Sequence, residues 1–421
     1  MSSTREGGGA ARKRSVTRRG LGVPLADRAR LLGTETAFAV SAEASAAAAE
    51  GRKVYPFHLG DLNIPTPENI VDASLKALRD GKTGYCPNGG IPELREALAS
   101  DITDSHGVRY GVENVAIQPG GKPVICKFLL TLMNPGDEVL YPNPGFPIYE
   151  SLIRFFGGVP VPYTYVEEAN RFALDMDGLE SRITPRTRLL ILNDLHNPTS
   201  AECSSDELTH LAALARDNRM CVLCDEAYFD VRFEGKSQSL ASLPGMAERS
   251  VILYTFSKKF AMTGWRLGAA VGPRRIIDLI IGLNVNIESC SNHFIQWGAV
   301  EALTGDQAAP RAILATLRAR RDVALDLLNS IPGVRCLKPR TTFYLYPNIT
   351  EAVAMTGMVD CEAFRRAVLC ESGVSMCTRQ HFGHALPGER ELYLRFAYSG
   401  IDTQGISEGL CLLRRFIYQH T

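Results

Sequence analysis

Chemically reactive side chains follow several short apolar runs of this 421-residue chain. Asp225 comes directly after the run MCVLC, with Tyr228 three residues later, and Lys258 follows the run SVILYTF. Asn197 lies in NDLHNPTS after a third run, RLLILN, and Arg395 lies within LYLRFAYS near the C-terminus. Ligands of open parallel sheets bind beyond the carboxyl ends of the strands, so we expect these side chains to share one site.

A second group of residues has the types that bind phosphate. Gly120 and Gly121 form a turn, in QPGGKP, that opens a helix, and backbone N–H groups at such a position bind anions. Thr255 and Ser257 add two hydroxyls beside the lysine, and Arg266 follows in the same stretch, TFSKKFAMTGWRLG. These residue types together predict a phosphate site.

The two groups indicate one cofactor. An acid at a buried strand end, such as Asp225, can hold a pyridinium nitrogen protonated, which is the state in which the ring accepts electrons. A lysine beside a phosphate site, such as Lys258, can form a Schiff base when burial and cationic neighbours lower its pKa. The cofactor that needs these groups at once is pyridoxal 5′-phosphate.

The elements around these motifs predict an α/β fold. From about residue 113, short apolar runs alternate with helix-length stretches such as SSDELTHLAALARDNR. Strands that are apolar throughout and separated by helices indicate a mostly parallel sheet covered by helices on both faces. Helices are also expected at 34–50, at about 67–80 and in PELREALASDI.

The same patterns divide the chain into four segments. Residues 1–33 are interpreted as a basic flexible tail, and 34–60 as an N-terminal segment that joins the smaller domain. We expect a large cofactor-binding domain over 61–305 and a smaller α+β domain over 306–421. Within 1–22, six basic residues accompany a single acid, which also fits an organelle transit peptide.

Composition argues against several partners and compartments. Lys plus Arg and Asp plus Glu are both 46, which gives no reason to expect nucleic acid or an anionic membrane as a partner. No apolar stretch reaches the roughly 18 residues of a membrane span. Eleven scattered cysteines without a secretory apolar segment indicate free thiols in a reducing compartment, so we expect a cytoplasmic location.

We expect no metal site. Cys221 and Cys224 form a CxxC inside an apolar run, and residues three apart on a strand point to opposite faces. His381 and His384 have no evident carboxylate or cysteine partner, so they are interpreted as loop histidines.

The stretch SKKFAMTGWRLG, with NPT, DEAY and the upstream GKTGYCPNGGIPELREAL, resembles class I/II aminotransferases of PLP fold type I. The resemblance runs from about residue 34 to 416 with the motifs in family order, and it looks closest to the bacterial aspartate aminotransferase-like branch. It implies a homodimeric transaminase that moves an amino group from a small L-amino acid, of the aspartate or alanine type, to 2-oxoglutarate or pyruvate. Amino-acid metabolism is the implied setting.

The resemblance also implies a role for each site residue. Lys258 would be the Schiff-base lysine and move the proton between Cα and C4′, while Asp225 would pair with the pyridine nitrogen. Asn197 and Tyr228 would bond the phenolic oxygen, and Arg395 would bind the substrate α-carboxylate, helped by Asn197 and Gly60. The other implied cofactor contacts are ring stacking by Phe146, phosphate binding by Gly120, Gly121, Lys122, Thr255, Ser257 and Arg266, and a phosphate contact from Tyr85 to the neighbouring subunit.

Two other functions stay open. A lyase, cyclase or oxidase of specialised amino-acid metabolism would share Lys258, Asp225 and Arg395. A regulator could use the fold to sense a ligand, but the segment before Gly60 shows no helix-turn-helix pattern.

The chain departs from the family pattern in two places. Ser200 follows NPT where the family usually has glycine. Residues 284–294 lack the arginine that binds a second substrate carboxylate in some aspartate-specific members. Either Lys127 or an N-terminal residue replaces it, or Glu288 favours a neutral or cationic side chain, or Glu288 lies outside the pocket.

Overall fold

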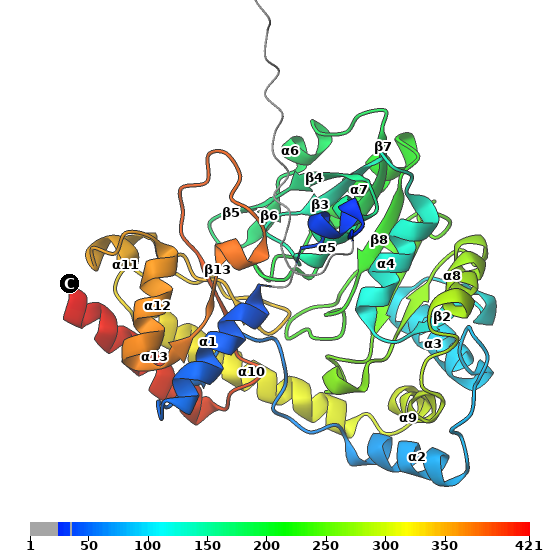
Figure 1. Ribbon diagram of the computed structural model, residues 1–421, viewed down its shortest axis with the longest axis horizontal. Coiled ribbons are helices and arrows are strands. Elements are labelled where there is room, and N and C mark those ends of the chain that lie inside the picture. The colour runs from blue at the N-terminus through cyan, green and yellow to red at the C-terminus, as the bar shows by residue number, and fades with distance from the viewer. Residues whose placement is uncertain (1–23, 34–35) are drawn as a thin grey trace, which may run out of the picture.

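The computed structural model describes residues 24–33 and 36–421. Its main sheet has seven strands in the order β2-β10-β9-β8-β7-β3-β4 (Figure 1). The pairs among β9, β8, β7, β3 and β4 are parallel, and β10 runs antiparallel to both of its neighbours. The strands are β2 (Val115–Gln118), β3 (Glu138–Pro142), β4 (Val159–Tyr163), β7 (Thr187–Leu192), β8 (Cys221–Asp225), β9 (Ser250–Thr255) and β10 (Gly268–Val271).

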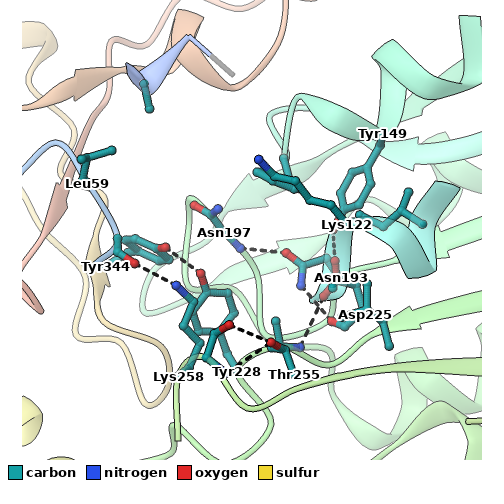
Figure 2. A pocket seen from close by; sticks show the side chains of 18 of the residues that line it. Leu59, Lys122, Tyr149, Asn193, Asn197, Asp225, Tyr228, Thr255, Lys258 and Tyr344 are labelled. Atoms are coloured by element: carbon teal, nitrogen blue, oxygen red, sulfur yellow. Dashed lines mark hydrogen bonds between the residues drawn. The ribbon is translucent and has the colours of Figure 1, made fainter. Parts of the chain in front are cut away.

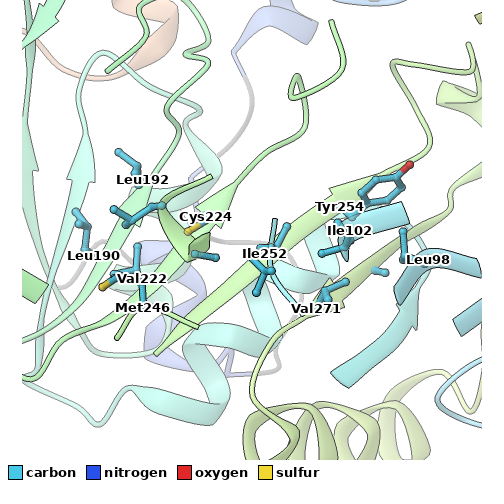
Figure 3. Packing of buried hydrophobic residues seen from close by; sticks show 14 of the residues in the cluster. Leu98, Ile102, Leu190, Leu192, Val222, Cys224, Met246, Ile252, Tyr254 and Val271 are labelled. Atoms are coloured by element: carbon cyan, nitrogen blue, oxygen red, sulfur yellow. The ribbon is translucent and has the colours of Figure 1, made fainter. Parts of the chain in front are cut away.

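Apolar side chains alternate between the two faces of this sheet. Leu190, Val222 and Ile252, from three adjacent strands, lie in one buried cluster, as Figure 3 shows. Cys224 belongs to that same cluster, whereas Cys221 packs against the cluster on the opposite face. The prediction that these two cysteines point to opposite faces is therefore confirmed.

Helices cover both faces, as the sequence predicts. On one face lie α3 (Pro92–His106), α7 (Ser205–Asp217) and α9 (His293–Thr304), whose apolar residues join the first cluster. On the other face lie α4 (Gly121–Leu132), α5 (Ile148–Phe155) and α8 (Arg274–Ile287). Each helix buries a single apolar stripe, which is the pattern of a helix packed on a sheet. Two further helices are α2 (Glu68–Arg79), which packs on α9, and the short α6 (Met176–Glu180).

The C-terminal part has its own sheet and core. Strands β11 (Tyr344–Leu345), β14 (Leu394–Ala397) and β13 (Cys377–Thr378) form a three-stranded antiparallel sheet. A third apolar cluster lies around it. The helices of this part are α10 (Ala308–Asn329), α11 (Thr350–Met355), α12 (Cys361–Ser372) and α13 (Thr403–His420).

The N-terminal segment pairs with this C-terminal part. Strand β1 (Tyr55–Pro56) pairs in parallel with β12 (Val374–Ser375). Helix α1 (Ala37–Ala49), blue in Figure 1, precedes it and lies within the expected range 34–50, of which residues 34–35 are outside the described residues. Among the described residues, no helix is both long enough and apolar enough to cross a membrane.

Some local structure goes beyond the sequence expectations. Within the segment expected to be a tail, Asp27–Leu31 form a 3-10 helix beside α5, where Arg28 lies 5.5 Å over the Phe155 ring and Gly33 N–H donates to Ser151 Oγ. The remaining tail residues, 1–23, lie outside the described residues. Strand β10 and the hairpin of β5 (Tyr165–Glu167) and β6 (Phe172–Leu174) were also not expected.

Candidate active site

A cavity of about 440 Å³ opens at the carboxyl ends of β7, β8 and β9. Of the residues that the sequence predicts, twelve line it: Gly60, Gly121, Lys122, Phe146, Asn197, Asp225, Tyr228, Thr255, Ser257, Lys258, Arg266 and Arg395. Phe38 also lines the cavity. So do Tyr149, Asn193 and Tyr344, which are labelled in Figure 2. The chain thus brings together residues up to 358 positions apart, from Ala37 to Arg395.

Lys258 lies in the turn that follows β9, with its amino group directed at the other wall of the cavity (Figure 2). Its Nζ donates a 2.8 Å hydrogen bond to the carbonyl oxygen of Gly60. A Cβ atom at position 60 would come within 2.2 Å of the Tyr344 hydroxyl, so only glycine fits there without a shift. The close approach of the Gly60 backbone therefore gives the lysine its hydrogen-bond partner.

Asp225 ends β8 as a nearly buried acid with few partners. Tyr149 Oη donates a 2.5 Å hydrogen bond to its Oδ2, and Asn193 Nδ2 donates to its carbonyl oxygen at 2.9 Å. Burial raises the pKa of Asp225 from 3.8 to about 6, and the hydrogen bond from Tyr149 opposes that rise. A buried carboxyl that faces a cavity gains most when a cationic partner occupies that cavity.

Arg395, in β14, is held with its guanidinium in a fixed plane. Nη2 donates to the His58 carbonyl oxygen at 2.5 Å, and Nη1 donates to Asn197 Oδ1 at 3.1 Å. Its Cζ lies 4.6 Å from the ring centroids of both Tyr344 and Phe382. Its buried Nε has no hydrogen-bond partner among the described residues. A planar, stacked guanidinium with an unused donor is suited to bind a carboxylate.

The phosphate-type residues also lie together. Gly120 has φ +103°, and a Cβ there would lie 2.4 Å from Nη2 of Arg266. Gly120 does not line the cavity itself but borders it, and Gly121 begins α4. Thr255 Oγ1 donates to Ser257 Oγ at 2.9 Å. A helix N-terminus, hydroxyls and a guanidinium in one place suit a phosphate dianion.

Tyr85, another predicted site residue, does not line the cavity of this chain. It is 88% exposed. The predicted role of Tyr85 concerns a neighbouring subunit, so it stays a prediction.

Sequence reasoning missed Tyr149, Asn193 and Tyr344. Asn193 begins the same NDLHNPT stretch as Asn197, and its Oδ1 accepts a 3.0 Å hydrogen bond from the Asn197 backbone N–H. Tyr344 Oη lies 2.6 Å from Tyr228 Oη. The position of Asn193 directly after a strand was an available signal, whereas the contacts of the two tyrosines depend on tertiary packing.

Lys127 and Glu288 do not line the cavity. Lys127 is 2% exposed, forms an ion pair with Glu288, and donates to Gln118 Oε1 at 2.8 Å and Asn284 Oδ1 at 2.6 Å. Lys127 therefore pairs with Glu288 instead of facing the cavity of this chain, and its replacement of the missing arginine stays a prediction. Glu288 lies outside this pocket, as one of the alternatives held.

Neither candidate metal pair gains further ligands. Within residues 24–33 and 36–421, no group of three or more His, Cys, Asp or Glu side chains is arranged to hold a metal ion. His381 Nδ1 lies 2.8 Å from Thr378 Oγ1, and His384 Nδ1 lies 3.3 Å from Glu150 Oε2.

Comparison with known proteins gives the family. The model of the family described as "Aminotransferase class I and II" matches residues 52–410. The chain is 33% identical over 363 residues to an aspartate aminotransferase of Geobacillus stearothermophilus, which covers 85% of this chain and 92% of that protein. The chain therefore belongs to the class I and II aminotransferases.

Solved structures agree. An aspartate aminotransferase from Thermus thermophilus with maleate has a TM-score of 0.85 at 29% identity, over 93% of this chain and 99% of that one. An alanine aminotransferase from Pyrococcus furiosus has a TM-score of 0.85 at 27% identity, over 94% and 100%. The fold is PLP fold type I, and the protein is a transaminase that uses pyridoxal phosphate. The lyase, cyclase or oxidase alternative is not favoured.

The residues of the cavity fit that cofactor. The nearly buried Asp225 carboxyl suits a pyridinium nitrogen, and the Gly120 turn beside Arg266 leaves room that a Cβ would fill. Lys258 lies on the same cavity as both groups.

Proposed function

We propose that the protein transfers an amino group from a small L-amino acid, of the aspartate or alanine type, to 2-oxoglutarate or pyruvate. The observation that carries this proposal is the common cavity of Lys258, Asp225 and Arg395. The names of similar proteins, aspartate and alanine aminotransferases, support the donor class. Amino-acid metabolism is the corresponding setting.

The cavity assigns a task to each of these groups. Bound pyridoxal phosphate supplies an electron-accepting ring, and an aldehyde carbon that receives the amino group. Asp225 would hold the proton on the ring nitrogen, since its carboxylate is buried at the strand end. Phe146, which lines the same cavity, would stack on the ring. Lys258 would bind the cofactor covalently between turnovers and then carry the proton removed from the substrate Cα.

Substrate orientation would come from Arg395. Its guanidinium would bind the α-carboxylate in a two-pronged contact, next to Asn197 and Gly60. A carboxylate held by Arg395 would leave the Cα–H bond, rather than the Cα–carboxylate bond, facing Lys258, and this would favour proton transfer over decarboxylation. Asn197 and Tyr228 would hydrogen-bond the phenolic oxygen of the cofactor.

Phosphate binding would use the N-terminus of α4. Gly120, Gly121, Lys122, Thr255, Ser257 and Arg266 would hold the phosphate group, because they combine backbone N–H groups, hydroxyls and cations at one end of the cavity.

The site is proposed to be completed in a homodimer. Tyr85 is 88% exposed, and Val285 and Ile287 of α8 are 55% and 59% exposed. Asn88 Nδ2 donates to the Ser289 carbonyl oxygen at 2.6 Å, which joins the Tyr85 loop to the end of α8. These exposed apolar side chains would pack against a second copy, and Tyr85 would reach the phosphate in that copy.

Mixing two inactive variants tests the dimer. Lys258→Ala protein keeps Tyr85, and Tyr85→Ala protein keeps Lys258, so a mixed dimer has one complete site. Activity that reappears after the two are unfolded and refolded together supports the proposal, with each variant refolded alone as the control. Activity that stays absent although sedimentation shows mixed dimers contradicts the role of Tyr85.

Domain limits and location are proposed on separate grounds. The large domain would span 61–305 and the small domain 306–421 with 34–60, because the C-terminal sheet has its own apolar cluster. All eleven cysteines of the chain lie in the described residues as free thiols, which supports a reducing compartment and hence the cytoplasm.

Amino transfer itself is tested by product analysis. The protein with pyridoxal phosphate is incubated with ¹⁵N-labelled L-aspartate or L-alanine and 2-oxoglutarate. We expect labelled glutamate together with oxaloacetate or pyruvate. Release of ammonia or carbon dioxide in place of labelled glutamate would contradict the proposal.

A further inference from the structure

Ser200 and Thr342 both have the left-handed backbone that glycine favours. Their φ angles are +57° and +64°, although neither is glycine. Ser200 follows NPT in the loop after β7, and Thr342 lies two residues before Tyr344 of β11. Non-glycine residues with strained backbones persist where neighbouring contacts hold them, so their contacts matter.

The hydroxyls of these two residues form a closed ring of three hydrogen bonds with Tyr344. Ser200 Oγ donates to the Tyr344 carbonyl oxygen at 2.9 Å, and the Tyr344 backbone N–H donates to Thr342 Oγ1 at 3.2 Å. The third bond joins Ser200 Oγ and Thr342 Oγ1 at 2.6 Å. Since the Ser200 proton is given to a carbonyl, which only accepts, Thr342 must be the donor in this last bond.

The ring fixes the backbone of Tyr344 at both its N–H and its C=O. Thr342 is anchored in turn, because its N–H donates to the Val231 carbonyl oxygen and its own carbonyl oxygen accepts from Tyr398 Oη. Ser200 and Thr342 are 8% and 0% exposed, so water does not compete strongly for these bonds. A hydroxyl on the NPT loop therefore connects that loop to the strand that carries Tyr344.

The side chain of Tyr344 lies among the groups that the reaction needs. Its Oη lies 2.6 Å from Tyr228 Oη, and its ring lies under the Arg395 guanidinium. Its hydroxyl also occupies the space beside Gly60, whose carbonyl oxygen accepts from Lys258. A displacement of Tyr344 would thus change its hydrogen bond with Tyr228 and its stacking against Arg395.

We propose that Ser200 is a positioning residue, which acts through the backbone of Tyr344 to set the hydrogen bond that Tyr344 makes with Tyr228. The inference rests on the proposed function, in which Tyr228 contacts the phenolic oxygen of the cofactor. When it is ionised, that oxygen can only accept hydrogen bonds. The Tyr228 hydroxyl therefore donates to the phenolic oxygen and accepts a hydrogen bond from Tyr344. The donation from Tyr344 strengthens Tyr228 as a donor.

These hydrogen bonds can be tested by the visible absorption spectrum of the protein with bound pyridoxal phosphate, recorded across a range of pH. The quantity measured is the pH at which the spectral change is half complete, called the midpoint below. A weaker bond from Tyr228 stabilises the negative phenolic oxygen less, so the proton shared with the Lys258 nitrogen is held to higher pH. Tyr344→Phe is expected to raise the midpoint by about 0.5 to 1 pH unit. The charged groups that line the same cavity as this pair are Lys258, Arg395 and Asp225, and the substitution changes none of them.

Ser200→Ala should raise the midpoint in the same direction. The double variant with Tyr344→Phe should shift it no further than Tyr344→Phe alone, because both changes act on one bond. Ser200→Gly distinguishes the loss of the hydroxyl from backbone strain, since glycine adopts the φ of +57° readily and has no hydroxyl. It should fold at least as stably as Ser200→Ala and still raise the midpoint.

Thr341→Val is the matched control. Thr341 is buried next to Thr342, and its hydroxyl donates to the Val231 carbonyl oxygen at 2.9 Å without touching Tyr344. We expect an unchanged midpoint. The inference is overturned if Ser200→Gly and Ser200→Ala leave the midpoint at the wild-type value, or if their shifts add fully to that of Tyr344→Phe. Failure of wild-type protein to transfer an amino group would instead contradict the proposed function, so the two failures are distinguishable.

Discussion

The phenol of Tyr149 donates a 2.5 Å hydrogen bond to Oδ2 of Asp225, deep in the wall of the cavity. Tyr149 belongs to α5, on one face of the main sheet, and Asp225 ends the central strand β8. The bond favours the charged form of an acid whose pKa burial raises to about 6. Tyr149 thus helps Asp225 to stay ionised where a pyridinium partner would lie.

Removal of this phenol hydroxyl is expected to weaken catalysis. In Tyr149→Phe the pKa of Asp225 rises further, so the acidic limb of the pH–rate profile moves to higher pH. We expect kcat/KM to fall about tenfold, the equivalent of one lost hydrogen bond to a charged group. Steady-state rates across the pH range measure both effects.

Tyr163→Phe provides the control for the loss of a buried phenol. Tyr163 Oη donates to the Ile191 carbonyl oxygen at 2.9 Å and makes no hydrogen bond with Asp225. Its pH–rate profile should match that of the wild type. An equal displacement of the acidic limb in both variants would refute the role given to Tyr149.

Asp194 should make the cofactor-free protein less stable as pH rises. It is buried beside Cys203, whose backbone N–H donates to Oδ1 at 2.6 Å, and burial raises its pKa from 3.8 to about 7. The folded state holds the Asp194 proton more tightly than the unfolded state does. The free energy of unfolding is therefore unaffected by ionisation of Asp194 below pH 3.8, falls as the pH rises, and has lost the full contribution above about pH 7. Each pKa unit corresponds to about 1.4 kcal/mol.

The variant Asp194→Asn should remove most of that pH dependence, since its side-chain oxygen can still accept from Cys203. Urea unfolding at several pH values across the window measures the change. The exposed acid Asp217 offers a control, and Asp217→Asn should keep the wild-type slope. If the free energy of unfolding of Asp194→Asn also changed with pH as steeply as in the wild type, groups other than Asp194 would be responsible for the pH dependence.

Arg395→Lys is expected to impair substrate binding while cofactor binding persists. A lysine cannot reproduce the two-pronged guanidinium held by His58 and Asn197, nor its stacking between Tyr344 and Phe382. We expect kcat/KM for the amino donor to fall by about 10- to 100-fold.

The dissociation constant of pyridoxal phosphate serves as the internal control, because the phosphate-type residues around Arg266 are unchanged. A variant that keeps wild-type kcat/KM would show that another group binds the α-carboxylate.

Long apolar strands and amphipathic helices were predictable from the sequence, because their periodicity reflects burial on one or both faces. The runs RLLILN and MCVLCD correspond to β7 and β8, and the reactive residues that follow them line one cavity. Strand β10 was missed, since GAAV is short and lacks β-branched residues apart from Val271.

The site residues that were not predicted from the sequence depend on packing between distant segments. Tyr149 lies on a helix whose rotation about its axis sets its contact with Asp225, and Tyr344 lies on a two-residue strand. No local pattern distinguishes these tyrosines from ordinary core aromatics. The ring of hydrogen bonds at Ser200 likewise joins positions 142 residues apart.

The most direct test of the central claim is the visible absorption spectrum of the protein with pyridoxal phosphate, recorded for the wild type and for Lys258→Ala. The account predicts that L-aspartate or L-alanine replaces the visible band of the wild type with the shorter-wavelength band of the pyridoxamine form, and that 2-oxoglutarate or pyruvate restores it. Lys258→Ala should show neither change at a comparable rate. A wild-type protein that develops no visible band with the cofactor, or a Lys258→Ala protein that responds as the wild type does, would contradict the account.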